Sequence, residues 1–163
     1  MKCFLILLSI FFIDYTYANQ SYKDVLFKSA TLSIPTKWKV KVENNCLSVN
    51  DPSAQGSGDF TVCKYISSED SDYFIKNEDD KWEAMTEGVP VLADVNVISK
   101  LTGLSAIVEC RYKDDAGYHV DQCFQAEIFL PKNAGFTFVG KGNPHFYDAY
   151  KKIYLSFKLK GID

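Results

Sequence analysis

The sequence predicts an α+β domain in which an antiparallel β-sheet meander is flanked by helices, ends in a C-terminal amphipathic helix and carries two disulfides. Three observations favour this class. Short runs of alternating apolar residues are separated by turns rich in Gly, Pro, Asn and Asp, which is typical of antiparallel strands. An apolar stripe with helical spacing follows Asn143, and four cysteines lie beyond an N-terminal leader.

Residues 1–18 predict a signal peptide. Lys2 precedes an apolar run over residues 3–13, and a small residue, Ala18, stands at the expected cleavage point. The run is shorter than the ~20 apolar residues that a membrane-spanning helix needs. We therefore expect one domain over residues 19–163, periplasmic or secreted, with no stable membrane insertion after the signal is removed.

The four remaining cysteines are Cys46, Cys63, Cys110 and Cys123. In an exported domain an even set predicts two disulfides, for which three connectivities exist. The simplest pairs Cys46 with Cys63 and Cys110 with Cys123, so that each bond closes one hairpin near its open end. A metal site is disfavoured, because no two cysteines have a C-x-x-C spacing and the two histidines lie far apart in sequence.

Strand-forming composition recurs between turn signals along the chain. A polar leader is expected before the first strand, and a turn at residues 101–104 leads into a central hairpin. The strands are expected at residues 31–34, 38–42, 44–49, 59–66, 91–99 and 136–140, with the two arms of the hairpin within residues 104–130.

A first helix is expected over residues 67–85, because Ile75, Trp82 and Met85 can share one face. Acidic residues crowd this segment and suit the first turns of a helix. They do not have the alternate spacing and central glycine of a calcium-binding loop, so we expect a solvated helix face and no metal or cofactor. These acids are Glu69, Asp70, Asp72, Glu78, Asp79 and Asp80.

A second helix is expected after Asn143, which can cap a helix that starts with a proline at position 144. Phe146, Tyr150, Ile153 and Phe157 follow at i, i+4, i+7 and i+11, which places all four on one face.

The order of these elements resembles the Mog1/PsbP-type α/β sandwich, which small exported bacterial proteins of the DcrB type share. The residues that carry the resemblance are Ile34-Pro35-Thr36-Lys37-Trp38 in an early strand and Tyr154-Leu155-Ser156-Phe157 at the end of the last helix. A mid-chain helix and a meander lie between them. The resemblance implies a sandwich fold, and it implies an envelope-maintenance or ligand-binding role as one possible function.

The central hairpin contains a conflict between its cysteines and its apolar residues. A two-residue loop at Ala116-Gly117 places Cys110 opposite Cys123, where a disulfide is feasible. That register puts the apolar residues of the two arms on opposite faces, because side chains alternate along a strand. Either both faces of the hairpin are covered, or a bulge lies between the disulfide and the arms.

The tip of this hairpin is the candidate site for a protein partner. Tyrosine gives a large contact area at low conformational cost and is enriched at interfaces. The alternative is that the tyrosines cover the side chains of the hairpin itself, with the aspartates serving as turn residues. The candidate partner-binding residues are Tyr112, Asp114, Asp115, Tyr118 and His119.

Other function classes lack support in the sequence. Arg111 is the only arginine and the net charge is −3, which disfavours nucleic acid as a partner. No hydrolase, zinc-protease or phosphate-loop motif occurs, and Gly140-Lys141-Gly142 is expected to be a turn. A nucleophilic Cys123 beside His119 would require a free thiol, which a disulfide removes.

We therefore expect a non-enzymatic exported protein that binds a protein partner, most specifically an immunity protein that neutralises a secreted antibacterial toxin. The alternative from a different class is an envelope-maintenance or small-ligand- or lipid-binding module of the DcrB type, with a lined pocket between sheet and helix. A hydrolase with an unrecognised site is the third possibility.

Overall fold

The computed structural model describes residues 21–53, 58–66, 73–86, 89–114 and 117–161, and it describes the side chains of all these residues except 112–114 and 119. The predicted signal peptide lies outside the described residues.

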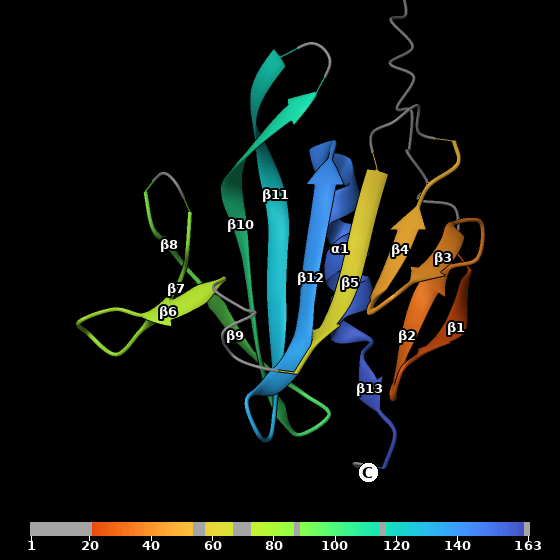
Figure 1. The fold of residues 1–163 in the computed structure, drawn as a ribbon, viewed down its shortest axis with the longest axis horizontal. Helices are drawn as coiled ribbons and strands as arrows, with labels where there is room; N and C mark the ends of the chain where they lie inside the picture. Colours follow the sequence, from red (N-terminus) through yellow and green to blue (C-terminus); the bar gives the residue numbers. More distant parts are fainter. Residues whose placement is uncertain (1–20, 54–57, 67–72, 87–88, 115–116, 162–163) are drawn as a thin grey trace, which may run out of the picture.

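Strands dominate the described chain, and antiparallel pairing joins them into three sheets (Figure 1). The strands are β1 (Tyr22–Phe27), β2 (Ala30–Pro35), β3 (Lys39–Glu43), β4 (Cys46–Asn50), β5 (Gly58–Tyr65), β6 (Phe74–Lys76), β7 (Trp82–Ala84), β8 (Val91–Leu92), β9 (Asp94–Ile98), β10 (Leu101–Asp114), β11 (Gly117–Leu130), β12 (Ala134–Gly142) and β13 (Lys158–Leu159). A 3₁₀ turn, η2 (Pro144–Phe146), leads into the helix α1 (Tyr147–Leu155).

The largest sheet has seven strands in the order β3-β4-β5-β12-β11-β10-β9. The two smaller sheets are β1-β2-β13 and β6-β7-β8. The predicted antiparallel sheet and C-terminal helix are therefore confirmed. The prediction of helices flanking the sheet is wrong for the described residues, because β-structure supplies most of the covering layers.

One face of the seven-stranded sheet, which we call the helix face, packs against α1 and the β1-β2-β13 sheet. Aromatic rings from the sheet and the helix fill the space between them, including Phe60, Phe124 and Phe138 from the sheet and Tyr150 and Tyr154 from α1. On the opposite face, which we call the open face, the β6-β7-β8 sheet covers part of β10 and β11 and forms a second, smaller apolar cluster.

The start of the predicted C-terminal helix and the burial of its stripe are confirmed, although α1 ends at Leu155 and Phe157 lies beyond it. The Oδ1 atom of Asn143 accepts a hydrogen bond from the backbone N–H of His145 at 3.2 Å, which satisfies one of the free donors at the helix start. Phe146, Ile153 and Phe157 are buried, as the spacing predicts. The first turn is 3₁₀ rather than α, which is common at helix termini.

Tyr150 of α1 packs directly against the sheet. Its ring stacks on Phe60 with centroids 4.9 Å apart, and its hydroxyl donates a hydrogen bond to the carbonyl of Lys141 at 2.8 Å. A Cβ atom at position 140 would stand 2.3 Å from the Tyr150 ring. Only glycine at position 140 allows the ring to approach the backbone of β12 this closely.

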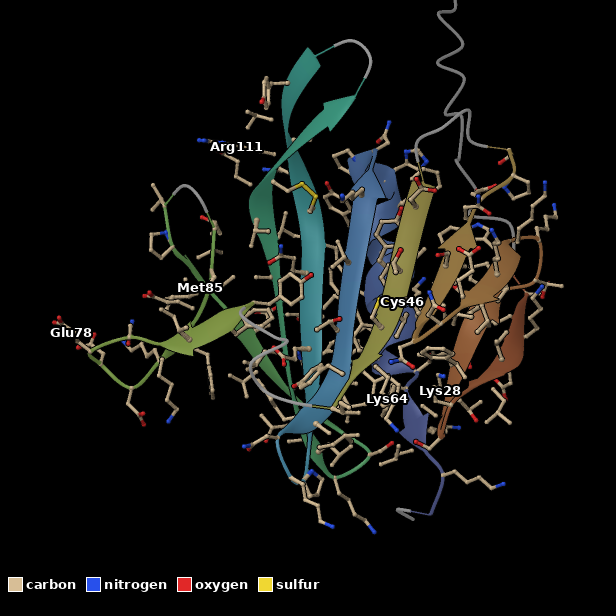
Figure 2. All side chains as sticks on the ribbon, in the orientation of Figure 1. Lys28, Cys46, Lys64, Glu78, Met85 and Arg111 are labelled. Atoms are coloured by element: carbon tan, nitrogen blue, oxygen red, sulfur yellow. A yellow bond between two sulfur atoms is a disulfide. The ribbon has the colours of Figure 1, made fainter. Side chains whose placement is uncertain are left out.

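The predicted helix over residues 67–85 is wrong within the described part, where the chain forms the β6–β7 hairpin. The Oδ1 atom of Asn77 accepts hydrogen bonds from the backbone N–H groups of Asp79 and Lys81, at 3.0 and 2.9 Å. Asp80 adopts a left-handed φ of 61°. An Asn side chain that bonds its own following backbone competes with helix formation and favours a tight turn. Figure 2 shows Glu78 at the far end of this hairpin, so the acids described there are turn residues.

Two predicted irregular segments are strands in the structure. The polar leader contains β1, which pairs with β2 along its whole length. The turn expected at residues 101–104 lies instead at Ser99 and Lys100, which adopt left-handed φ values of 49° and 63°. Gly140-Lys141-Gly142 forms the end of β12 rather than a turn.

The two buried tyrosines of α1 give a matched pair for mutagenesis. The Tyr154 hydroxyl is buried and has no hydrogen-bond partner among the described residues, whereas the Tyr150 hydroxyl is paired. We expect Tyr150→Phe to lower the free energy of unfolding by about 1 kcal/mol, and Tyr154→Phe to leave it unchanged or to raise it. Urea unfolding at neutral pH measures both values. Equal losses in the two variants would contradict this assignment.

The same tyrosines predict a loss of stability in alkali. Burial raises the pKa of Tyr150 and of Tyr154 above the ordinary value near 10. Nearby acids raise both further, and the Asn96 side chain offsets part of the rise for Tyr154. The unfolded chain then releases phenolic protons that the folded chain retains, so stability is complete below about pH 10 and falls as the pH rises further. Urea unfolding above and below pH 10 tests this, and Tyr154→Phe should reduce the slope.

Candidate functional site

The candidate site is the part of the central hairpin that extends beyond the sheet, residues 107–123, which we call the arm. On one side, β9 pairs with β10 only as far as Ser105. On the other side, β12 pairs with β11 only from Phe124 onward. Within the described residues, the remaining parts of β10 and β11 pair with each other alone, and they stand out from the sheet as a two-stranded ribbon (Figure 1).

The register of the arm differs from the predicted one by two residues. Asp114 pairs with Gly117, so Gly117 belongs to β11 and not to the predicted two-residue loop, and it adopts a φ of 123° that favours glycine. Cys110 lies opposite Asp121, and the disulfide joins it to its diagonal neighbour Cys123. Their Cα atoms are 5.8 Å apart, within the usual range for a disulfide.

A shift by two residues leaves every side chain on its predicted face. The apolar residues of β10 and β11 therefore still point to opposite faces of the hairpin, and both faces are buried. Phe124 and Ile128 lie in the core under α1. Leu104 and Val108 lie on the other face in the cluster under the β6-β7-β8 sheet. The first predicted resolution, that both faces are covered, is confirmed, although a small sheet rather than a helix covers the second face.

Both predicted disulfide pairings are present. Cys46 pairs directly with Cys63 at the open end of the β4–β5 hairpin, with Cα atoms 4.1 Å apart. Cys110–Cys123 lies closer to the tip of its hairpin than to the open end, which corrects its predicted position. There it closes the base of the arm.

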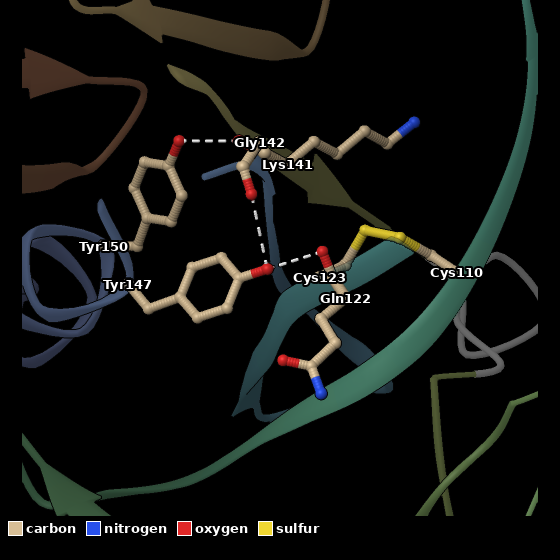
Figure 3. The surroundings of a disulfide bond; sticks show 7 residues. All are labelled: Cys110, Gln122, Cys123, Lys141, Gly142, Tyr147 and Tyr150. Atoms are coloured by element: carbon tan, nitrogen blue, oxygen red, sulfur yellow. Dashed lines mark hydrogen bonds between the residues drawn. A yellow bond between two sulfur atoms is a disulfide. The ribbon is translucent and has the colours of Figure 1, made fainter. Parts of the chain in front are cut away.

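Two tyrosines of α1 fix the base of the arm to the rest of the domain. The Tyr147 hydroxyl donates to the carbonyl of Gln122 at 2.5 Å and lies 3.4 Å from that of Gly142 (Figure 3). Tyr150 holds the neighbouring carbonyl of Lys141. Burial raises the pKa of Tyr147, and the charge of Asp121 raises it further, so the hydroxyl keeps the proton that it donates.

The predicted partner-binding residues do not form one described surface. The register places Tyr112 opposite His119 at one rung and Lys113 opposite Tyr118 at the next, while Asp115 lies outside the described residues. Tyr118 is 84% exposed. For Tyr112, Asp114 and His119 the structure gives the backbone position alone.

Residues that the sequence did not single out share the face of Tyr118. Val120 follows it at i+2 and lies opposite Arg111. Val120 is 60% exposed, Ile107 lies further down the same face, and Figure 2 shows the Arg111 side chain extending from the arm. Alternation places all of them on one face in either register, but their exposure depends on where β9 and β12 stop pairing, which the sequence did not predict.

The described residues offer little for metal or thiol chemistry. Within the described ranges, no group of three or more His, Cys, Asp and Glu residues lies together as a metal site would require. Cys123 is bonded to Cys110 and therefore offers no free thiol. No helix in the described part of the chain is long and apolar enough to cross a membrane.

Comparisons with known proteins define the fold of this chain. No protein-family model matches the sequence, and none of the curated proteins matches it. A crystal structure of a protein from Bacteroides thetaiotaomicron VPI-5482 superposes with a TM-score of 0.52 at 11% identity over 86% of this chain, and the match spans 49% of that protein's length. The solution structure of cyanobacterial PsbP (CyanoP) from Synechocystis sp. PCC 6803 gives a TM-score of 0.51 at 9% identity, over 88% of this chain and 95% of that one.

At these identities the likeness bears on the fold alone. The chain has a PsbP-like fold, in agreement with the PsbP part of the resemblance seen in the sequence, whereas the DcrB part of that resemblance stays a prediction.

Removing the Cys110–Cys123 disulfide should loosen the arm. The bond closes a loop of 13 residues, for which chain entropy predicts a loss of about 3 kcal/mol when both cysteines become serine. Amide hydrogen exchange should accelerate along Gly117–Cys123 more than along β4 and β5. The matched control is the double serine variant of Cys46 and Cys63, which should leave exchange in the arm unchanged. Equal exchange in the arm with and without Cys110–Cys123 would show that the disulfide does not brace it.

Proposed function

We propose that this domain is a non-enzymatic exported protein that binds another protein through the arm. The observation that supports the proposal best is the exposed face of the arm, where Tyr118, Val120 and Arg111 stand outside the body of the domain. Tyrosine and arginine are the residue types that most often dominate binding energy at interfaces.

The way the arm is held supports the same proposal. Its base is closed by a disulfide and bonded to Tyr147 of α1. A segment that is already ordered loses less conformational entropy on binding than a free loop does. Two disulfides also support an exported location, because disulfides persist in the periplasm and outside the cell and are rare in the cytosol.

We further propose that the partner is a secreted antibacterial toxin and that the domain acts as its immunity protein in the periplasm. A narrow two-stranded ribbon on a rigid sheet has a shape that can enter the active-site cleft of an enzyme. The shape of the arm and the proposed export of the domain are the two grounds for the immunity role.

A competition experiment tests the immunity role. The gene is deleted, and the deletion strain is grown together with its wild-type siblings after complementation with defined variants. We expect the wild-type gene to protect the deletion strain and the double variant Tyr118→Ala/Val120→Asp to fail. The control Leu26→Asp also introduces an acid at an exposed apolar residue, on β1, and should protect fully.

Survival of the uncomplemented deletion strain among its siblings would remove the immunity role. Full protection by the arm variant would show instead that binding does not use the arm. The two results therefore separate the function from its location.

The second candidate function is binding of a small ligand, as the envelope-module alternative expects. The expected place for its pocket, between sheet and helix, is occupied by the aromatic rings that pack α1 on the sheet. A cavity of about 580 Å³ lies on the open face instead. Native mass spectrometry of protein taken from the cell envelope should detect a bound small molecule if this candidate is correct, and a bare mass would count against it.

A further inference from the structure

The cavity on the open face lies over β3, β4, β5 and β12, beside the part of the sheet that the β6-β7-β8 sheet covers. Its volume of about 580 Å³ falls in the range of small-molecule sites, roughly 300–1,000 Å³. We call it the lysine groove and define it by six of its lining residues: Lys39, Lys41, Ser48, Asn50, Asp59 and Lys141.

The strand register places four of these residues in one row across the sheet. Lys39 pairs with Asn50, Asn50 with Asp59, and Asp59 with Lys141. Neighbouring strands lie about 4.8 Å apart, so the two lysines at the ends of the row have Cα atoms about 14 Å apart. Their side chains are long enough to reach toward one another over the polar residues between them.

A second row lies beside the first. Lys41 pairs with Ser48, Ser48 with Thr61, and Thr61 with Val139. One end of the groove therefore has two lysines on β3, its middle has hydroxyl and amide groups, and its far end has Lys141.

The charge of the groove is opposite to that of the chain. Three lysines and one aspartate line it, whereas the whole chain has a net charge of −3. Lys41 pairs with Glu43, but within the described residues neither Lys39 nor Lys141 forms an ion pair. Asp59 is the cross-strand neighbour of Lys141 and still forms no ion pair with it. The positive charge at both ends is therefore available to a ligand.

We propose that the lysine groove binds a small hydroxylated anion of the sugar phosphate or sugar acid class. A lysine ammonium binds phosphate or carboxylate as a point charge, so the anionic group belongs at an end of the groove. Asp59 accepts hydrogen bonds and repels anions, so the middle of the groove selects hydroxyl groups, which Asn50 and Ser48 also bind. This gives a place and a ligand class to the second candidate function, and it does not depend on binding by the arm.

An NMR titration of the full domain tests the proposal. Glucose 6-phosphate is added to ¹⁵N-labelled protein, with glucose and inorganic phosphate as partial ligands. We expect shifts at the amides of Lys39, Asn50, Asp59 and Lys141, weaker binding as salt increases, and clearly weaker binding of either partial ligand. A separate titration uses vesicles of phosphatidylglycerol, whose headgroup also combines a phosphate with hydroxyl groups.

Matched variants show which groups carry the binding. The double variant Lys39→Ala/Lys141→Ala should weaken glucose 6-phosphate binding by about tenfold or more, which corresponds to the loss of one charged contact. Lys152→Ala removes the same charge from an exposed residue of α1 and should have no effect. Asp59→Ala should bind inorganic phosphate at least as well as the wild type while it loses its preference for the sugar phosphate.

The outcomes separate the parts of the proposal. Binding to phosphatidylglycerol vesicles alone, lost in the double lysine variant, would support the ligand class and assign it to a lipid headgroup. Glucose binding as strong as that of glucose 6-phosphate, equal weakening by Lys152→Ala, or no shift with any probe would overturn the proposal. A Tyr118→Ala variant should bind all probes as the wild type does. The absence of ligand binding in the groove would therefore leave the proposed protein binding by the arm unaffected.

Discussion

The packing of Tyr150 against Phe60 is the contact on which the helix face depends. The two rings lie 4.9 Å apart and nearly parallel, and the approach of α1 to the sheet at this point requires a glycine at position 140. The hydroxyl then satisfies the carbonyl of Lys141 at the end of β12. One side chain thus fixes the distance between the helix and the sheet and anchors the end of a central strand.

Burial on two sides gives the central hairpin its particular character. A half-buried strand has one apolar face, whereas the lower part of β10 and β11 contributes residues to clusters on both faces. Beyond the edge of these layers, the same two strands continue with polar and exposed side chains. A single continuous hairpin therefore forms the centre of the fold along one half and an exposed ribbon along the other.

Prediction from the sequence succeeded where one local signal and the tertiary packing agree. The helix after Asn143 combines a cap, a proline at the start and a stripe that meets the sheet, and the structure has all three. The cysteine pairing was also predictable, because each hairpin carries its own two cysteines. Prediction failed in the segment around Asn77, where an apolar spacing of helical type competes with an Asn side chain that bonds the next turn.

The sequence predicted the arm as a hairpin but did not predict which residues form its exposed face. The turn composition around Gly117 predicts a hairpin, but two adjacent loop positions satisfy the same composition. Only the pairing of Asp114 with Gly117 decides between them. The exposure of Val120 beside Tyr118 then follows from alternation and from where β9 and β12 end, and the positions of those strand ends are properties of the whole sheet.

The position of β12 has a consequence for the order in which the chain gains structure. This strand lies between β5 and β11, and it pairs Thr137 with Cys63, far earlier in the chain. The core of the helix face is completed by α1, which follows β12. A nascent chain therefore lacks the middle of its sheet until both late segments have been synthesised, and contacts between such distant segments form slowly. The stable fold of the described domain therefore forms only after β12 and α1 have joined the earlier strands.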